Sequence, residues 1–206
     1  MNTSSSLSDQ LMAQLDGASM QALSRQLGAD TAQTATAVSA ALPLLFGAMG
    51  RNTEQQGGAD SLMQALQRDH TGGGGVADLL NSVLGGGGGG GRSNDGAAIL
   101  GHIFGGAQQQ RVESGLGQAT GLGANAGNLL QMLAPIVMAF LAQRVQNSHL
   151  DSGALGQSLN EERRQAQQQG GLAGGLLGSL LDQDGDGQVG MSDLIKIGGA
   201  LFGGKR

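Results

Sequence analysis

The sequence predicts an all-α fold that is built by tandem duplication of a multi-helix unit. Strand-like alternation is nearly absent, whereas apolar residues recur at helical spacing, and the order of the apolar segments occurs twice along the 206 residues. With four Phe and no Trp or Tyr, the core must consist mainly of Leu, Ala, Met, Ile and Val. The 40 Gly residues predict several connectors and a modest stability, because each Gly loses much backbone entropy on folding.

The N-terminal part of the chain carries the first helical patterns. Apolar residues at intervals of three and four form one stripe, made of Leu7, Leu11, Leu15, Ala18 and Ala22. Asp30 followed by Gln33 is typical of a capping box, which predicts a long helix through the Ala-rich run to about Met49. Pro43 should kink or restart that helix, because proline lacks the backbone donor and clashes with the preceding turn. A shorter stripe consists of Leu62 and Leu66.

The second half of the chain repeats the order of the first. The motif A-A-L-P-L-L-F-G-A-M around Pro43 corresponds to Q-M-L-A-P-I-V-M-A-F-L-A around Pro135, 92 residues later. Three more segments repeat at offsets that drift up to 98 residues, beginning at Asp60, Asp78 and Ile99 in the first unit and at Gly153, Gly175 and Ile197 in the second. The predicted boundary lies near Gly106, which gives a first repeat over 1–106 and a second over 107–206.

The first repeat has a run of glycines, 85–91, where the second has a segment rich in carboxylates. The glycine run predicts a flexible connector. The carboxylate segment, 182–193, reads D-Q-D-G-D-G-Q-V-G-M-S-D, which is the spacing of an EF-hand calcium loop with carboxylates at loop positions 1, 3, 5 and 12. The predicted ligands are Asp182, Asp184, Asp186, the backbone carbonyl of Gln188, a bridging water at Gly190, and Asp193.

Ca²⁺ is the cofactor that this loop predicts, with Mg²⁺ as the alternative. Asp193 is one methylene shorter than the usual Glu, which weakens bidentate closure and narrows the preference for Ca²⁺ over Mg²⁺. A solvated turn is the other interpretation, since Asp and Gly are turn formers. Four carboxylates this close together would repel one another without a cation, which favours the metal site. The loop holds four of the 16 acidic residues and accounts for most of the net charge of −5.

Three of the apolar motifs, L-P-L-L-F-G-A-M, I-L-G-H-I-F-G-G and L-L-Q-M-L-A-P-I-V-M, together resemble a bacterial family of unknown function, numbered 937 among such domains. The resemblance covers about Leu23 to Leu159. It implies a bacterial, mainly helical protein without an established activity, and it supplies no catalytic residues. The segment 182–193 resembles the calcium loop of bacterial dockerin modules. A dockerin carries two such loops and this chain has one, so no cohesin partner is inferred.

Composition argues against several other classes of function. There is no basic patch to meet phosphates, which argues against nucleic-acid binding. The charged run 161–164 is predicted to be a solvated helix face. The chain has no Cys, so disulfides and thiolate chemistry are excluded. His102 lies in an apolar helix pattern, which predicts a partly buried structural histidine rather than a catalyst.

The two most apolar runs, 37–50 and 129–142, are predicted to be buried core helices. Both are too short to span a bilayer and each contains a proline. The N-terminal residues lack the basic and apolar pattern of a signal peptide, from which a cytoplasmic location is expected. Export by a route without a signal peptide is left open.

The leading hypothesis is a non-enzymatic calcium-binding helical protein, in which one Ca²⁺ structurally fixes a C-terminal helix–loop–helix. The alternative is a self-associating or scaffolding helical module that binds copies of itself or another protein and works without metal. An enzyme is not expected, because no acid–base pair or activated nucleophile is apparent outside the loop.

Overall fold

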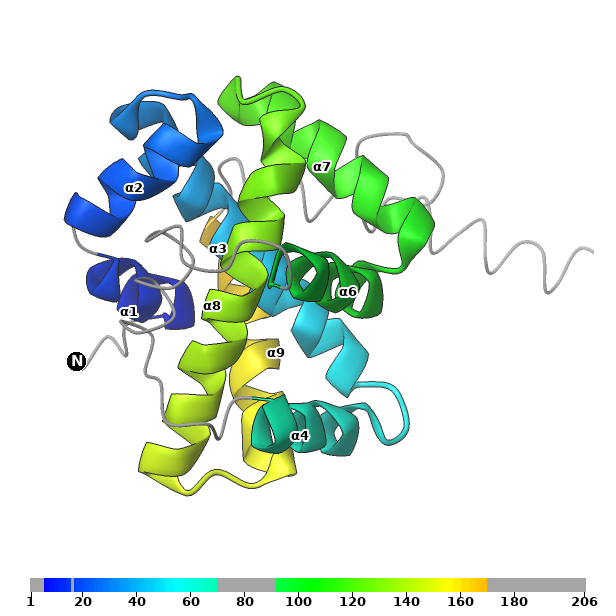
Figure 1. Ribbon diagram of the computed structural model, residues 1–206. Helices are drawn as coiled ribbons and strands as arrows, with labels where there is room; N and C mark the ends of the chain where they lie inside the picture. The colour runs from blue at the N-terminus through cyan, green and yellow to red at the C-terminus, as the bar shows by residue number, and fades with distance from the viewer. Residues whose placement is uncertain (1–5, 16, 70–91, 170–206) are drawn as a thin grey trace, which may run out of the picture.

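The structure, a computed structural model, describes residues 6–15, 17–69 and 92–169 (Figure 1). Within these ranges the regular elements are all α-helices and there is no strand, which confirms the all-α prediction. The eight helices of the described residues are α1 (Leu7–Gln14), α2 (Gly17–Leu27), α3 (Thr31–Thr53), α4 (Gly58–Asp69), α6 (Arg92–Phe104), α7 (Gly106–Thr120), α8 (Asn125–Ser148) and α9 (Ser152–Gln169).

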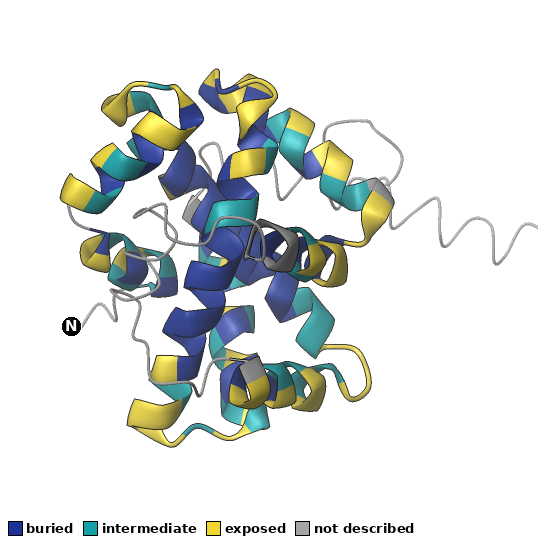
Figure 2. Ribbon diagram, viewed as in Figure 1, coloured by how far each residue is buried: buried dark blue, intermediate teal, exposed yellow. Residues whose placement is uncertain are grey.

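The centre of the fold consists of the two longest helices, α3 and α8. Every residue is buried over 40–50 in α3 and over 133–142 in α8, and Figure 2 shows these stretches in dark blue at the middle of the molecule. Both helices are long and apolar enough to cross a membrane, and 72% of the most apolar window of each is buried inside the fold. The runs 37–50 and 129–142 thus lie within core helices in this structure.

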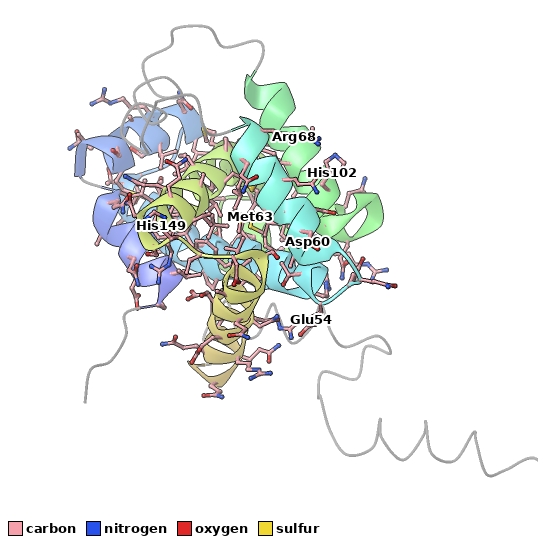
Figure 3. All side chains as sticks on the ribbon, turned by 90° about the horizontal axis from the view of Figure 1, so that it is seen from below. Glu54, Asp60, Met63, Arg68, His102 and His149 are labelled. Atoms are coloured by element: carbon pink, nitrogen blue, oxygen red, sulfur yellow. The ribbon has the colours of Figure 1, made fainter. Side chains whose placement is uncertain are left out.

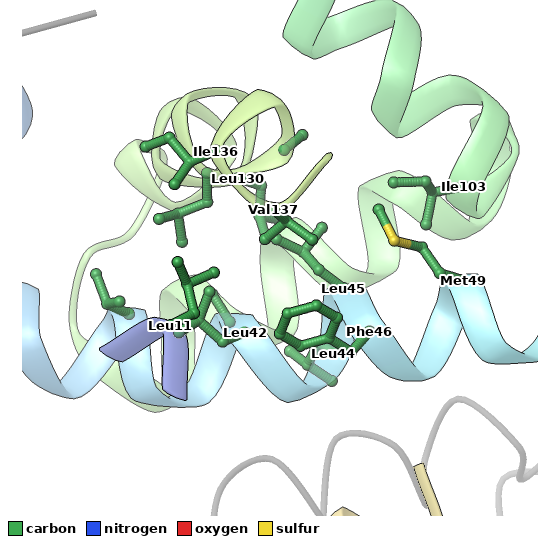
Figure 4. Close-up of a cluster of buried hydrophobic side chains, with 14 of the residues drawn as sticks. Leu11, Leu42, Leu44, Leu45, Phe46, Met49, Ile103, Leu130, Ile136 and Val137 are labelled. Carbon is green, nitrogen blue, oxygen red and sulfur yellow. The ribbon is translucent and has the colours of Figure 1, made fainter. Parts of the chain in front are cut away.

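The core is aliphatic, as the composition predicts. Buried Leu, Ala, Ile, Val and Met side chains form one continuous cluster to which both central helices contribute. Figure 4 shows Leu11 of α1 near Leu42 of α3, with Val137 of α8 facing the same helix. Phe46 and Phe140 meet edge to face, with ring centroids 6.1 Å apart and planes at 63°. The α3 and α8 helices therefore share a single core.

Pro43 and Pro135 lie inside α3 and α8 without ending either helix. The α3 helix does not restart at Pro43, and it continues to Thr53, beyond the end predicted near Met49. Each proline leaves the carbonyl four residues earlier without its helical donor. For Pro135 this is the carbonyl of Gln131, and α6 packs so closely on it that a Cβ on Gly96 would lie 2.1 Å from the oxygen. The glycine therefore permits the close approach of α6 to α8.

The predicted N-terminal stripe is divided between α1 and α2. Its three leucines are buried, whereas Ala18 is exposed. A capping box starts α1, because the Ser6 hydroxyl accepts from the Asp9 N–H and the Asp9 carboxylate accepts from the Ser6 N–H. Both short helices pack on α3. Two separate helices can follow the surface of α3 where one straight helix could not.

Helices from distant parts of the chain lie side by side. The α9 helix packs mainly on α3 and also contacts α4, while α6 packs mainly on α8. The α1 helix contacts both α3 and α9. The helix ends are consequently held by side chains that come from far away in the sequence.

Candidate functional site

The predicted calcium ligands lie outside the residues that the structure describes. This applies to Asp182, Asp184, Asp186, Gln188, Gly190 and Asp193, and equally to the glycine run 85–91. In the described ranges no group of three or more His, Asp or Glu side chains could hold a metal ion. Figure 3 labels the titratable side chains Glu54, Asp60, Arg68, His102 and His149, of which Asp60 and Arg68 share the helix α4. The metal site remains a prediction from the sequence.

Glu162 of α9 is a buried carboxylate, with 4% of its surface exposed. It accepts hydrogen bonds from the backbone N–H of Leu7 at 2.6 Å and of Ser8 at 3.1 Å, and also from the Ser8 hydroxyl. These groups are at the N-terminal end of α1, where backbone N–H groups have no partner inside the helix. Both the hydrogen bonds and the positive end of the helix dipole stabilise the negative charge. Glu162 therefore fastens α1 to α9 and has a structural role.

The charged run 161–164 is only partly the solvated face that the sequence predicts. Glu161 and Arg164 are exposed, but Glu162 is buried, so the prediction is wrong for that residue. Its burial follows from the orphan N–H groups of α1. The residues of 161–164 contain no pattern that would indicate these N–H groups of a distant helix.

An ion pair joins α9 to the end of α3. Arg163 donates from Nη1 to Glu54 Oε2 at 3.0 Å and from Nη2 to Oε1 at 2.5 Å, which is the two-pronged geometry typical of arginine and carboxylate. This hydrogen bonding lowers the pKa of Glu54 below its ordinary value, although desolvation opposes the shift. The Glu54 side chain is 47% exposed, so solvent screens the pair.

Two side-chain amides form a reciprocal contact between helix ends. Gln33, in the first turn of α3, donates to the carbonyl of Thr120 at the end of α7 at 3.1 Å. Asn125, the first residue of α8, donates to the carbonyl of Leu27 at the end of α2 at 2.9 Å. Each donor therefore satisfies a terminal carbonyl that has no helical partner. Asp30 caps α3 by accepting from the Gln33 N–H at 2.7 Å, which is one half of the predicted capping box, but the Gln33 side chain bonds to Thr120 and does not return to the cap.

The C-terminal end of α3 holds the junction between α6 and α7. Asn52 donates from Nδ2 to the carbonyls of His102 and Ile103, at 3.2 and 2.9 Å. Arg51 donates from Nη2 to Oε1 of Gln108 at 3.0 Å. His102 itself is exposed rather than partly buried, so that prediction is wrong.

Comparison with known proteins decides the family. Residues 9–144 match the model of a family described as bacterial protein of unknown function (DUF937). The chain belongs to this family. No curated protein matches the chain, and no solved structure does.

The part that matches DUF937 begins in α1 and ends in α8. It contains both internal prolines and both amides of the reciprocal contact, and it confirms the resemblance that the apolar motifs predicted. The α9 helix, with Glu162, and the segment 182–193 follow it in the chain. Sequence reasoning missed Glu162 and the two amides because their partners lie between 87 and 155 residues away.

Proposed function

We propose that the protein is a non-enzymatic calcium-binding helical protein, in which one Ca²⁺ fixes a C-terminal helix–loop–helix. The observation that carries the proposal is the ligand spacing of 182–193, with carboxylates at loop positions 1, 3, 5 and 12 and Gly187 at position 6. Asp182, Asp184 and Asp186 would repel one another without a cation. Mg²⁺ is the competing ion, because Asp193 closes the shell with a short side chain.

We further propose that the helical part is a tandem duplication and that the calcium loop belongs to one copy only. The reciprocal contact supports the duplication, since Gln33 and Asn125 are separated by 92 residues, the offset that also separates Pro43 from Pro135. Each amide contacts the end of the helix that precedes the other amide, as an approximate two-fold relation between the copies requires. Where the second copy has the calcium loop, the first has the glycine run 85–91.

Metal binding would act as a structural clasp in this arrangement. The ordered loop requires neutralisation of its carboxylates, so the free energy of binding adds to the stability of the folded state. A structural role is favoured over a sensor role, because sensor loops usually occur in pairs and this chain carries one such loop.

Isothermal titration calorimetry on the full chain tests the proposal. Wild-type protein should bind about one Ca²⁺, and Asp182→Ala with Asp184→Ala should abolish the binding heat. Asp60→Ala with Glu161→Ala removes the same charge at two exposed positions outside the loop and should leave the heat unchanged. Absence of binding by the wild-type protein overturns the calcium proposal and leaves the metal-independent self-associating module as the function to pursue.

A further inference from the structure

The connection between α6 and α7 is a single residue. The α6 helix ends at Phe104 and α7 begins at Gly106, so Gly105 alone turns the chain. Its dihedral angles, φ 73° and ψ 152°, lie in a region that essentially only glycine adopts. A Cβ at this position would meet nothing within 4 Å, so an added side chain would affect the backbone conformation and not the packing.

The helices on either side of Gly105 depend on each other. We use "N-terminal half" for α1 to α6 and "C-terminal half" for α7 to α9. Glu162 of the C-terminal half caps α1, Arg163 pairs with Glu54, and the Gln33 and Asn125 amides cross between the halves in opposite directions. Polar contacts of the described residues thus join the halves at several separate places.

Apolar packing also joins the two halves. The α9 helix packs mainly on α3 and α4 of the N-terminal half, and α6 packs mainly on α8 of the C-terminal half. Phe46 and Phe140 bring one ring from each half into contact. Each half therefore completes its core with the other, and a second copy of the chain offers an identical complementary half.

We propose that the protein forms a domain-swapped homodimer, in which Gly105 straightens, α6 and α7 join into one helix, and each half packs on the opposite half of a second copy. The joined helix, 92–120, would be about 43 Å long at 1.5 Å per residue. Contacts between the halves are kept, now between two chains. Only the turn itself and the contacts beside it change.

The hydrogen bonds from Asn52 to the end of α6 are compatible with the proposed domain swap. In a continuous helix the carbonyls of His102 and Ile103 would accept from backbone N–H groups four residues later. In the bent form the Asn52 amide serves both carbonyls instead. These two carbonyls are therefore satisfied in both forms, and protein concentration decides between the forms because a half from the same chain is always near at hand. The proposal does not depend on calcium.

Gly105→Ala is the first test. The substitution strains the bent turn and suits a continuous helix, so it should raise the dimer association constant about tenfold or more. Protein refolded from denaturant at low and high concentration, with chelator present, is analysed by size exclusion with light scattering. Gly28→Ala is the control for strain alone, since Gly28 has φ 63°, has free space for a Cβ, and lies in a longer connection. Equal dimer fractions for the two variants would overturn the proposal.

An engineered disulfide distinguishes a swapped dimer from two intact molecules side by side. A Cβ on Gly156 of α9 would lie 3.6 Å from the Cβ of Thr53 in α3, which suits a disulfide, and the chain has no other Cys. After oxidation of Thr53→Cys with Gly156→Cys, the isolated dimer should run as a covalent dimer on a non-reducing denaturing gel, and the isolated monomer as a single chain. A dimer fraction that runs as single chains contradicts the exchange.

A longer connection gives the opposite prediction and keeps the test open should Gly105→Ala fail to fold. Three glycines inserted after Gly105 remove the strain of the one-residue turn and disfavour a continuous helix. The dimer fraction at high concentration should then fall severalfold below that of the wild-type chain. An unchanged fraction counts against Gly105 as the hinge.

Discussion

At the scale of single residues, Glu162 has the largest predicted effect on stability among the charged side chains described. Glu162→Ala leaves the buried N–H of Leu7 and the partly buried N–H of Ser8 without their partner, which should cost about 2–3 kcal/mol of unfolding free energy. Glu161→Ala, at the exposed neighbouring position, should change it by no more than about 0.5 kcal/mol. Urea titrations followed by circular dichroism measure both, since the chain has no Trp or Tyr for fluorescence. Equal effects of the two substitutions would show that Glu162 does not hold α1.

Gly96 is the residue on which the contact between α6 and α8 depends. In Gly96→Ala the new Cβ would lie 2.1 Å from the carbonyl oxygen of Gln131, so the helices must separate, at a cost of about 1–3 kcal/mol. Gly101→Ala adds the same methyl group to α6 where nothing lies within 4 Å, and it should stabilise the helix by up to about 1 kcal/mol. Urea titrations should show that the two substitutions change the unfolding free energy in opposite directions. Changes in the same direction would contradict the close approach of α6 to α8.

At the scale of helices, the pair of Glu54 and Arg163 should make the attachment of α9 to α3 depend on pH. Because folding lowers the pKa of Glu54, its contribution is present above the unfolded pKa of about 4.3 and is lost as the pH falls through the folded value. Because the Glu54 side chain is exposed, solvent screening limits the contribution of the ion pair to the unfolding free energy to about 0.5 kcal/mol.

Glu54→Gln should therefore lower stability slightly at pH 7, and the difference should shrink as the pH falls through the folded pKa of Glu54, where the wild-type carboxyl group becomes protonated as well. High salt should reduce the difference at pH 7, because the pair is exposed. Urea midpoints for the variant and for Glu161→Gln, which changes the charge equally at an exposed site, provide the comparison. A difference that does not shrink as the pH falls would mean that the ion pair is not its cause.

The helices could largely be predicted from the sequence, because their signals are local. Asp30 marks the start of α3 through a contact three residues away, and the leucines of α1 mark its buried face by their spacing. The break between α1 and α2 depends instead on their packing against α3. The contact of the Gln33 side chain depends on Thr120, to whose carbonyl it donates. The predicted restart at Pro43 is wrong, since tertiary packing keeps α3 continuous across a residue that disfavours a helix.

At the scale of the whole molecule, the candidate site and the fold rest on different observations, the first on local sequence spacing and the second on contacts between distant residues. The candidate calcium site can be predicted from the sequence because all its proposed ligands lie in one short segment, 182–193. The contacts that unite the helices cannot, since Glu162 and Leu7 become neighbours only after the chain has folded. The family match, 9–144, covers most of the helical part and none of the loop. The calcium proposal and the swapped dimer therefore stand on separate observations and can fail separately.

Calcium should stabilise the whole molecule if the loop binds it as proposed. A ligand at 100 times its dissociation constant adds about 2.7 kcal/mol to the unfolding free energy, which raises the melting temperature of a chain of this size by about 5–10 °C. Melting followed by circular dichroism, with saturating Ca²⁺ and with chelator, measures the shift. Asp182→Ala with Asp184→Ala should melt at one temperature in both buffers. Glu162→Ala should melt lower in both and keep the calcium-dependent difference, because it weakens the helical part without touching the ligands. Loss of that difference in Glu162→Ala would instead mean that the loop is formed only when α9 and α1 are joined.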